Sequence, residues 1–292
     1  MIEIMNKLLP ITIVIFMFGN LLEMGLKLKL DEALQALRNV RFVTLSLIWC
    51  FVLGPLFAVL LTKILPLAEP YALGLILLGM VPCAPFMPIV AQKARGDLAY
   101  VATFMLLAAV GTVVYMPLMV PVLCKGITAD TWTIAKPLVL FIAFPLALGI
   151  AVRRAAEPFA EKAHPIVKKV TGIDTLLLLI ILLLANWRDF LGAVGTYAIA
   201  TQFVYYGVLA AASYGVGFGL SHGQKSVLAL GVCTRNTGPA IAPLYAVAGA
   251  DQRAITMCVM SVYIGAIVGF ATARVLSRLS AASDPAGDTH SY

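Results

Sequence analysis

The chain has 292 residues, of which 61% are hydrophobic and only 12% are charged. An ordinary soluble domain is nearer half apolar and a quarter charged, so the composition excludes that class. The formal net charge of +7 is not accompanied by a basic stripe with interleaved aromatic residues, which makes nucleic-acid binding a poor explanation of the charge.

The charged residues are clustered, and the apolar stretches between them are long enough to cross a bilayer core of roughly 30 Å as helices. The alternating pattern of a membrane β-barrel is absent. The sequence therefore predicts an all-α polytopic membrane protein with nine transmembrane helices, followed by a disordered polar tail over residues 280–292. The predicted helices cover 8–25, 41–63, 71–92, 98–123, 133–152, 173–190, 196–220, 225–248 and 252–276.

Lysine and arginine are unequally divided between alternate loops. Fourteen fall on one side of the predicted helices and six on the other, and Arg235 lies inside an apolar segment. Cytoplasmic loops carry the excess of these residues. We therefore expect the chain in the cytoplasmic (inner) membrane, with its N-terminus outside and its C-terminus in the cytoplasm.

Two of the apolar segments cannot be continuous helices. The first contains "MVPCAPFMPIV" and the second "TRNTGPAIAP", and each proline removes a backbone donor and clashes with the preceding turn. Proline kinks that serve only packing are the alternative interpretation. The residues expected to form the breaks and a crossover between them are Pro82, Cys83, Pro85 and Pro88 in the first segment and Gly238 and Pro239 in the second.

The spacing of the two broken segments predicts an inverted repeat. They lie five segments apart, and an odd offset means that they cross the membrane in opposite directions. Segments one to four would then match segments six to nine. The counterpart of the fifth segment would be a helix that is missing before the first segment. A matched pair of interrupted helices is the best sequence indication of a transporter's binding site near the bilayer midplane.

Arg235 is the residue that most needs an explanation, because an arginine at mid-bilayer costs several kcal/mol unless it is paired or hydrated. Three roles remain open. Its guanidinium could bond the carbonyls at the ends of the half-helices as a tethered cation, or clamp an anionic substrate. It could also form a buried pair with Glu23 or Asp174 that has no role in transport. The neighbouring Thr234, Asn236 and Thr237 either hydrogen-bond beside it or cap freed backbone groups.

The sequence offers little support for an enzyme or a bound cofactor. The three histidines, His164, His222 and His290, lie in predicted loops or the tail, without a partner arrangement typical of catalysis or of a metal cluster. All five cysteines fall within apolar segments, where a disulfide framework is not expected. Cys83 and Cys233 sit in the two breaks and could face each other across the crossover.

These features together resemble the bile acid:sodium symporter family in its bacterial branch. The resemblance runs from about Phe18 to Leu276 and is carried by "EMGLKLKLDEALQALRNVRFVTLSLIWCFVLGPLFAVLL", by "ALGLILLGMVPCAP" followed by "ARGDLA", and by "GVCTRNTGPAIAPL". It implies one transporter domain over residues 1–279 that moves an organic anion by alternating access. Within that domain it implies a core of about 41–124 and 196–277 with two crossing broken helices, and a panel of about 1–26 and 133–190.

The departures from the family concern its sodium site. Where sodium-coupled members carry Ser and Asn in the first break, this chain has Met87 and Pro88, and oxygen-bearing positions of the next helix fall near Met105 and Ala108. In the second break the family's Glu and Gln are replaced by Gly231 and Arg235, while Asn236 and Gly238 remain. A hard cation needs several oxygens, including a carboxylate. The resemblance therefore implies a carrier of a small organic anion that is not driven by sodium.

Three other functions stay open at this stage. One is ordinary sodium-dependent symport of an organic anion. A second is metalloid efflux, because the Pro82–Cys83 pair is similar to the arsenite-efflux branch of the superfamily and soft thiolates suit such ligands. The third is a membrane sensor that binds a ligand without moving it. The sequence specifies neither the substrate nor the oligomeric state.

Overall fold

The computed structural model describes residues 2–124, 127, 130–245 and 250–283. Over this part of the chain the regular elements are helices, and no strand is present. In chain order they are α1 (Ile2–Lys27), α2 (Leu30–Leu37), α3 (Val40–Ile48), η1 (Trp49–Leu53), α4 (Gly54–Ile64), α5 (Glu69–Gly79), α6 (Met87–Lys93), α7 (Leu98–Leu123), α8 (Thr131–Leu138), η2 (Val139–Ala143), α9 (Phe144–Ala155), α10 (Glu157–Ala193), α11 (Ala198–Gly215), α12 (His222–Cys233), α13 (Thr237–Tyr245) and α14 (Gln252–Ser283).

Six helices in the described residues are long and apolar enough to cross a membrane. Each overlaps a span predicted from the sequence, and the protein is accordingly a multi-pass, all-α membrane protein. The six are Leu8–Lys27, Val40–Ile64, Leu98–Leu123, Thr131–Ala155, Glu157–Ala193 and Gln252–Ala281.

The other three predicted segments differ from simple spans. Segment 71–92 consists of the two short helices α5 and α6, and segment 225–248 of α12 and α13. Segment 196–220 contains α11, which buries polar side chains such as Thr201 and Gln202 instead of presenting a uniformly apolar surface.

Two of the long spans contain a π-helical turn, and both turns have the same cause. The turn η1 is followed by Gly54 and Pro55, and η2 by Phe144 and Pro145. A proline lacks the N–H that would close a normal helical turn, and its ring pushes away the carbonyl four residues earlier. The turn widens locally to the π form, which bends the span without ending it.

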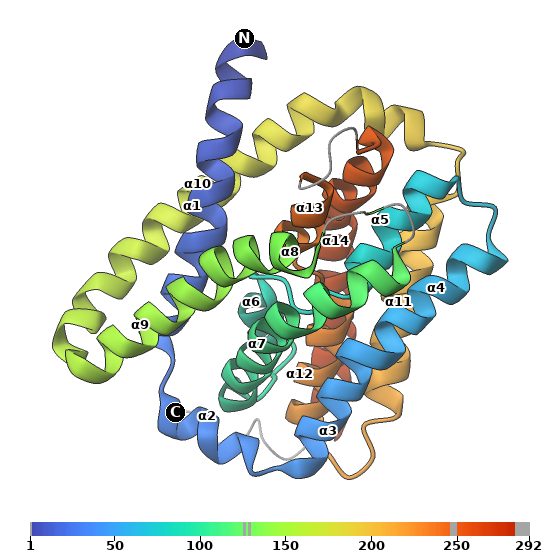
Figure 1. The fold of residues 1–292 in the computed structure, drawn as a ribbon. Helices are drawn as coiled ribbons and strands as arrows, with labels where there is room; N and C mark the ends of the chain where they lie inside the picture. The colour runs from blue at the N-terminus through green and yellow to red at the C-terminus, as the bar shows by residue number, and fades with distance from the viewer. Residues whose placement is uncertain (1, 125–126, 128–129, 246–249, 284–292) are drawn as a thin grey trace.

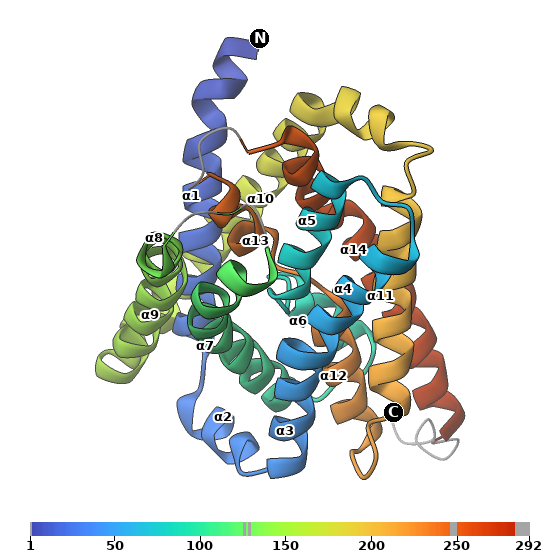
Figure 2. The ribbon, with the colours of Figure 1, turned by 45° about the vertical axis from the view of Figure 1, so that its right-hand side comes forward.

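The helices form two groups that lie side by side in Figures 1 and 2. In the first, α1 packs along α9 and α10. A Cβ built on Gly25 would lie 2.8 Å from the Cα of Gly149, so the backbones of α1 and α9 touch there. In the second, α5, α11 and α12 pack around α14. We call α1 and α8–α10 the panel, and α3–α7 with α11–α14 the core.

Three details at the element ends depart from the sequence expectations. The loop after Lys27 contains the short helix α2, whose Ala33 carbonyl accepts a 3.1 Å hydrogen bond from Thr103 Oγ1. The helix α10 begins at Glu157, well before the predicted residue 173, so His164 is helical. The helix α14 continues to Ser283 and includes the start of the predicted tail, while residues 284–292 lie outside the described residues.

Candidate functional site

The two broken helices meet where their linkers run past each other. Pro82 and Arg235 form an isolated antiparallel bridge. The amide of Cys83 donates to the carbonyls of Gly231 at 3.1 Å and Thr234 at 2.8 Å, and the amide of Asn236 donates to Val81 at 2.9 Å. Backbone groups freed by the breaks thus satisfy one another, which non-helical chain at membrane depth requires.

The threonines beside Arg235 act on the backbone and on α14. Thr234 Oγ1 accepts from the amide of Ala84 at 3.2 Å and donates to Leu230 O at 2.8 Å. Thr237 Oγ1 hydrogen-bonds Ser261 Oγ at 2.9 Å. Neither hydroxyl bonds the guanidinium.

The prolines and glycine of the breaks sit at helix starts and in close contacts. Pro88 lies in the first turn of α6, where a missing N–H costs nothing. Pro239 is buried in α13, and a Cβ built on Gly238 would lie 3.1 Å from Cγ of Met17 on the panel helix α1. Pro85 lines a cavity together with Asn236. The panel therefore touches the core directly at the second break.

Arg235 is 4% exposed, and its Nη1 donates to the carbonyl of Gly79 at 3.2 Å. Gly79 is the last residue of α5, so its carbonyl belongs to the four that a helix leaves without an intrahelical partner, at the end whose dipole favours a cation. The guanidinium also lies 5.2 Å from the ring centroid of Tyr205. Within the described residues, Nε and Nη2 have no hydrogen-bond partner.

Gly54 leaves the space that this guanidinium fills. A Cβ built on Gly54 would lie 2.9 Å from Arg235 Nη2 and 3.0 Å from the Trp49 carbonyl. The Tyr205 hydroxyl donates to the Gly54 carbonyl at 3.1 Å, which fixes the ring beside the cation. The arginine is thus held by α5, the η1–α4 junction and α11, all of them core elements.

The two carboxylates considered as partners of Arg235 lie elsewhere. Glu23 Oε1 is 3.6 Å from His164 Nε2, and its Oε2 accepts from Thr171 Oγ1 at 3.2 Å. Asp174 is buried on α10, and it is absent from the lining of the cavity that Arg235 faces. No carboxylate lies within 4.0 Å of Arg235 in the part of the chain that the structure describes.

A cavity of about 1630 Å³ lies between core and panel. Its core side includes Arg235, Asn236, Thr237 and Gly238, together with Pro82, Cys83, Pro85 and Pro88. Its panel side includes Glu23, His164 and Thr171. The cavity therefore brings together both breaks and the predicted polar residues around Arg235.

Comparison with known proteins places this chain among transporters. The family model described as "Sodium Bile acid symporter family" matches residues 14–193. The chain belongs to this family. The resemblance carried by the sequence motifs is confirmed, and members of the family are transporters, not enzymes.

Two relatives of the family come from Arabidopsis thaliana. The chain is 23% identical over 260 residues to the "Probable sodium/metabolite cotransporter BASS3, chloroplastic", which covers 87% of this chain and 60% of the relative. It is 26% identical over 151 residues to the "Probable sodium/metabolite cotransporter BASS1, chloroplastic", covering 51% of this chain and 38% of the relative. The chain thus spans less than two thirds of either relative.

Apolar groups and one guanidinium stand at the positions that the resemblance assigns to the family's sodium site. A Cβ built on Gly231 would lie 2.2 Å from Cε1 of Phe104, so the ring of Phe104 fills the space that a longer side chain would need. Met87 is fully buried and Ala108 is 3% exposed. In this family member, a ring, a methionine and a guanidinium lie where the resemblance expects oxygen ligands.

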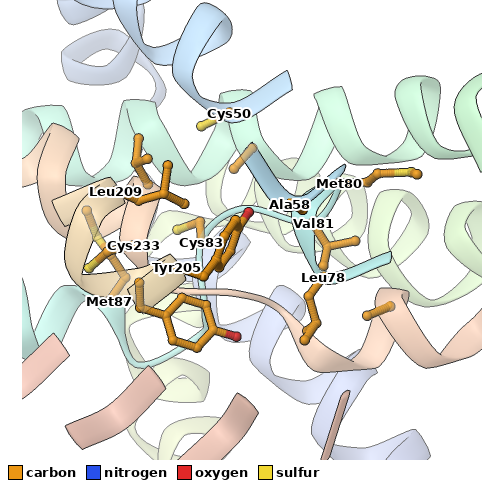
Figure 3. Packing of buried hydrophobic residues seen from close by; sticks show 14 of the residues in the cluster. Cys50, Ala58, Leu78, Met80, Val81, Cys83, Met87, Tyr205, Leu209 and Cys233 are labelled. Atoms are coloured by element: carbon orange, nitrogen blue, oxygen red, sulfur yellow. The ribbon is translucent and has the colours of Figure 1, made fainter. Parts of the chain in front are cut away.

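The cysteines of the breaks belong to the same buried cluster as Tyr205, as Figure 3 shows. Cys83 is 7% exposed, Cys233 is fully buried, and both are free. Cys83 has a φ of +69°, a conformation that is strained for a residue with a side chain. Strain of this kind is found at functional sites of proteins, here at the point where the chain turns from α5 into the crossover.

Sequence reasoning did not single out four residues of the site: Gly54, Gly79, Tyr205 and His164. The Gly54–Pro55 dipeptide is typical of a bent helix, but nothing in it points to a cation beside it. His164 lies among lysines and prolines that look like a loop, so its place on the cavity wall had no local signal.

Proposed function

We propose that the protein is a secondary transporter that moves a small organic anion by alternating access, and that Arg235 permanently replaces the sodium ion at the crossover. The observation that carries this proposal is the 3.2 Å hydrogen bond from Arg235 Nη1 to the carbonyl of Gly79 at the end of α5. A guanidinium there meets the same need as a bound cation, because it neutralises the carbonyl end of a half-helix.

The same arginine also suits the binding of an anion. Its charge is not cancelled by a carboxylate within 4.0 Å among the described residues, and Asn236 and Thr237 line the cavity beside it. A positive charge in a low-dielectric pocket attracts an anion more strongly than it would in water. The cation thus stabilises the crossover and favours anions over neutral solutes.

The proposal includes the finer architecture expected from the sequence, with nine transmembrane segments, an inverted repeat, and core and panel moving relative to each other. Support comes from the broken pairs α5/α6 and α12/α13 in corresponding positions. The proposed orientation has the N-terminus outside and the C-terminus in the cytoplasm. In both views the start of α1 lies at the top and α2, which follows Lys27 and Lys29, at the bottom.

Sodium-coupled symport is the second candidate, because both relatives are named as sodium/metabolite cotransporters. The two candidates differ in what sodium does to the purified protein. A symporter with a sodium site gains stability by mass action when sodium binds the folded state. A protein with a built-in cation does not.

The deciding experiment is the thermal stability of the purified protein in sodium, potassium and choline chloride at equal ionic strength. For the wild type we expect equal midpoints in the three salts. Arg235→Gln keeps an amide donor for Gly79 but removes the charge, and we expect a lower midpoint or a new response to sodium, together with loss of anion exchange. Arg253→Gln is the matched control, since Arg253 is an exposed arginine paired with Asp251.

A saturable stabilisation of the wild type by sodium alone would overturn the replacement of sodium and favour symport. Transport itself is measured by counterflow in proteoliposomes with labelled pyruvate, benzenesulfonate and taurocholate, which differ in apolar area. Exchange of at least one of these anions supports the carrier, whereas binding without flux would make the protein a sensor.

A further inference from the structure

The wall of the cavity opposite the crossover carries a carboxylate and an imidazole in contact. His164 Nε2 of α10 lies 3.6 Å from Glu23 Oε1 of α1, and each side chain is 22% exposed. Thr171 Oγ1 donates to the other oxygen of Glu23 at 3.2 Å. All three residues line the cavity. His164 Nε2 is buried and has no hydrogen-bond partner among the described residues.

The other carboxylates of the cavity lining already have permanent cations as partners. Glu32 is paired with Lys29 at 3.0 Å, and Glu161 with Arg153 at 3.5 Å. Within the described part of the lining, Glu23 is the carboxylate whose partner at ion-pair distance can gain or lose its charge near neutral pH. The wall therefore contains one pair whose total charge depends on a proton.

The charged groups around the pair come from three helices. Lys27 lies one turn beyond Glu23 on α1, and Lys168 lies one turn beyond His164 on α10. Arg153 of α9 acts on the imidazole through its charge. Arg153 is bonded to Glu157 at 2.7 Å as well as to Glu161, so much of its charge is balanced. Burial and the charges of Lys27, Lys168 and Arg153 disfavour a positive charge on the imidazole, and the carboxylate of Glu23 favours it.

From this arrangement we propose that Glu23 and His164 form a proton-binding site, and that the proton on His164 Nε2 and the anion in the cavity favour each other's binding. The proton comes from water, is held between Nε2 and Oε1, and returns to water on release. It adds one positive charge to the wall that faces an anion. This inference rests on the proposed anion transport.

The coupling follows from linkage. If the bound anion raises the affinity of the site for a proton, the proton must raise the affinity for the anion by the same factor. A monoanion that travels with one proton moves no net charge, so a pH gradient can drive its accumulation. Arg235 is part of the chain and cannot cross the membrane with the substrate, so it cannot act as a coupling ion. A proton bound at Glu23 and His164 can.

Proton binding is tested on the full chain in detergent by NMR of the histidine Cε1–H groups, of which the protein has three. His164→Gln assigns the signal of His164. We expect the His164 signal to titrate, and Glu23→Gln to lower the midpoint of that titration because a neighbouring carboxylate is removed. His222, which contacts Tyr214 and Ser226, serves as the internal control. A His164 that does not titrate, or that ignores Glu23→Gln, overturns the site.

Coupling is tested with benzenesulfonate and taurocholate in proteoliposomes, because sulfonates stay ionised and do not cross lipid as neutral acids. For the one that exchanges, we expect an acidic outside to accelerate wild-type uptake about fivefold or more. In His164→Gln we expect the ratio of the uptake rates at acidic and at neutral outside pH to fall to about one, because the titrating ring is gone. Acceleration equal to wild type in this variant overturns the coupling. Absence of wild-type exchange for every anion would instead refute the transporter, and the histidine titration distinguishes the two failures.

Discussion

The crossover and the panel wall present charge to the same cavity in opposite ways. At the crossover, Arg235 is 4% exposed, is fixed by Gly79 and Tyr205, and carries a permanent positive charge. On the wall, Glu23 and His164 are each 22% exposed, and their total charge changes with one proton. The permanent charge thus lies at the crossover, where the linkers of the two broken helices must stay joined. The variable charge lies on the panel helices that pack against the crossover.

This difference has a physical basis. A cation that closes the carbonyl end of a buried half-helix must remain charged throughout the cycle, because an uncompensated helix end in a low-dielectric region is costly. A coupling group has the opposite requirement, since it must exchange its ligand with water. The substitutions that follow first fill the space beside the fixed charge, then fill the space at Gly231, and finally weaken the wall.

The largest effect is expected for Gly54→Ala, which removes the space occupied by the guanidinium. The new Cβ would lie 2.9 Å from Arg235 Nη2 and 3.0 Å from the carbonyl of Trp49. We expect a loss of about 3 kcal/mol from overpacking and a displaced charged hydrogen bond, with no anion exchange. The measurements are chemical unfolding in detergent and counterflow. Gly207→Ala is the control, because nothing lies within 4 Å of a Cβ at that position of α11.

A Gly54→Ala protein that exchanges anions at the wild-type rate would show that the guanidinium has room to move. The fixed charge would then not be a requirement of transport. The contrast between a fixed charge at the crossover and a variable charge on the wall would not hold.

A smaller effect is expected for Gly231→Ala. Its Cβ would lie 2.2 Å from Cε1 of Phe104, whose side chain is 1% exposed and has little room to withdraw. We expect a loss of about 2 kcal/mol in unfolding free energy, reduced by the helix preference of alanine over glycine. The double variant with Phe104→Leu tests the cause, because the shorter side chain should restore most of the stability. A double variant no better than the single one would assign the loss to another contact.

The sequence allowed the local features of the fold to be predicted. Apolar length identified the six long spans, and the spacing of Pro82, Pro85 and Pro88 correctly indicated a broken helix, because a missing amide acts on the nearest turn. The inverted repeat stays a prediction. The predicted start of α10 at residue 173 was wrong, because the helix begins at Glu157. Its first turns carry lysines and prolines that resemble a loop.

The contacts of the site were beyond sequence reasoning for a different reason. Arg235 was identified from its position in an apolar run. Its partner Gly79 contributes a backbone carbonyl, which any residue has, and Tyr205 is one of many aromatic residues in the chain. Glu23 was considered as a partner of Arg235, whereas it contacts His164. Long-range pairing between helices depends on packing, and a single sequence does not encode it in a local pattern.

The smallest effect is expected for Thr171→Val on the wall. Valine keeps the methyl group that contacts Gly19 and loses the hydroxyl that donates to Glu23. Since Glu23 is partly exposed, water replaces much of this bond, and we expect a loss of about 1 kcal/mol in unfolding free energy. Anion exchange should persist, unlike in Gly54→Ala. Complete loss of exchange in a folded Thr171→Val protein would mean that the wall is as rigidly required as the crossover, and the contrast between a permanent and a variable charge would not describe how the two sides of the cavity work.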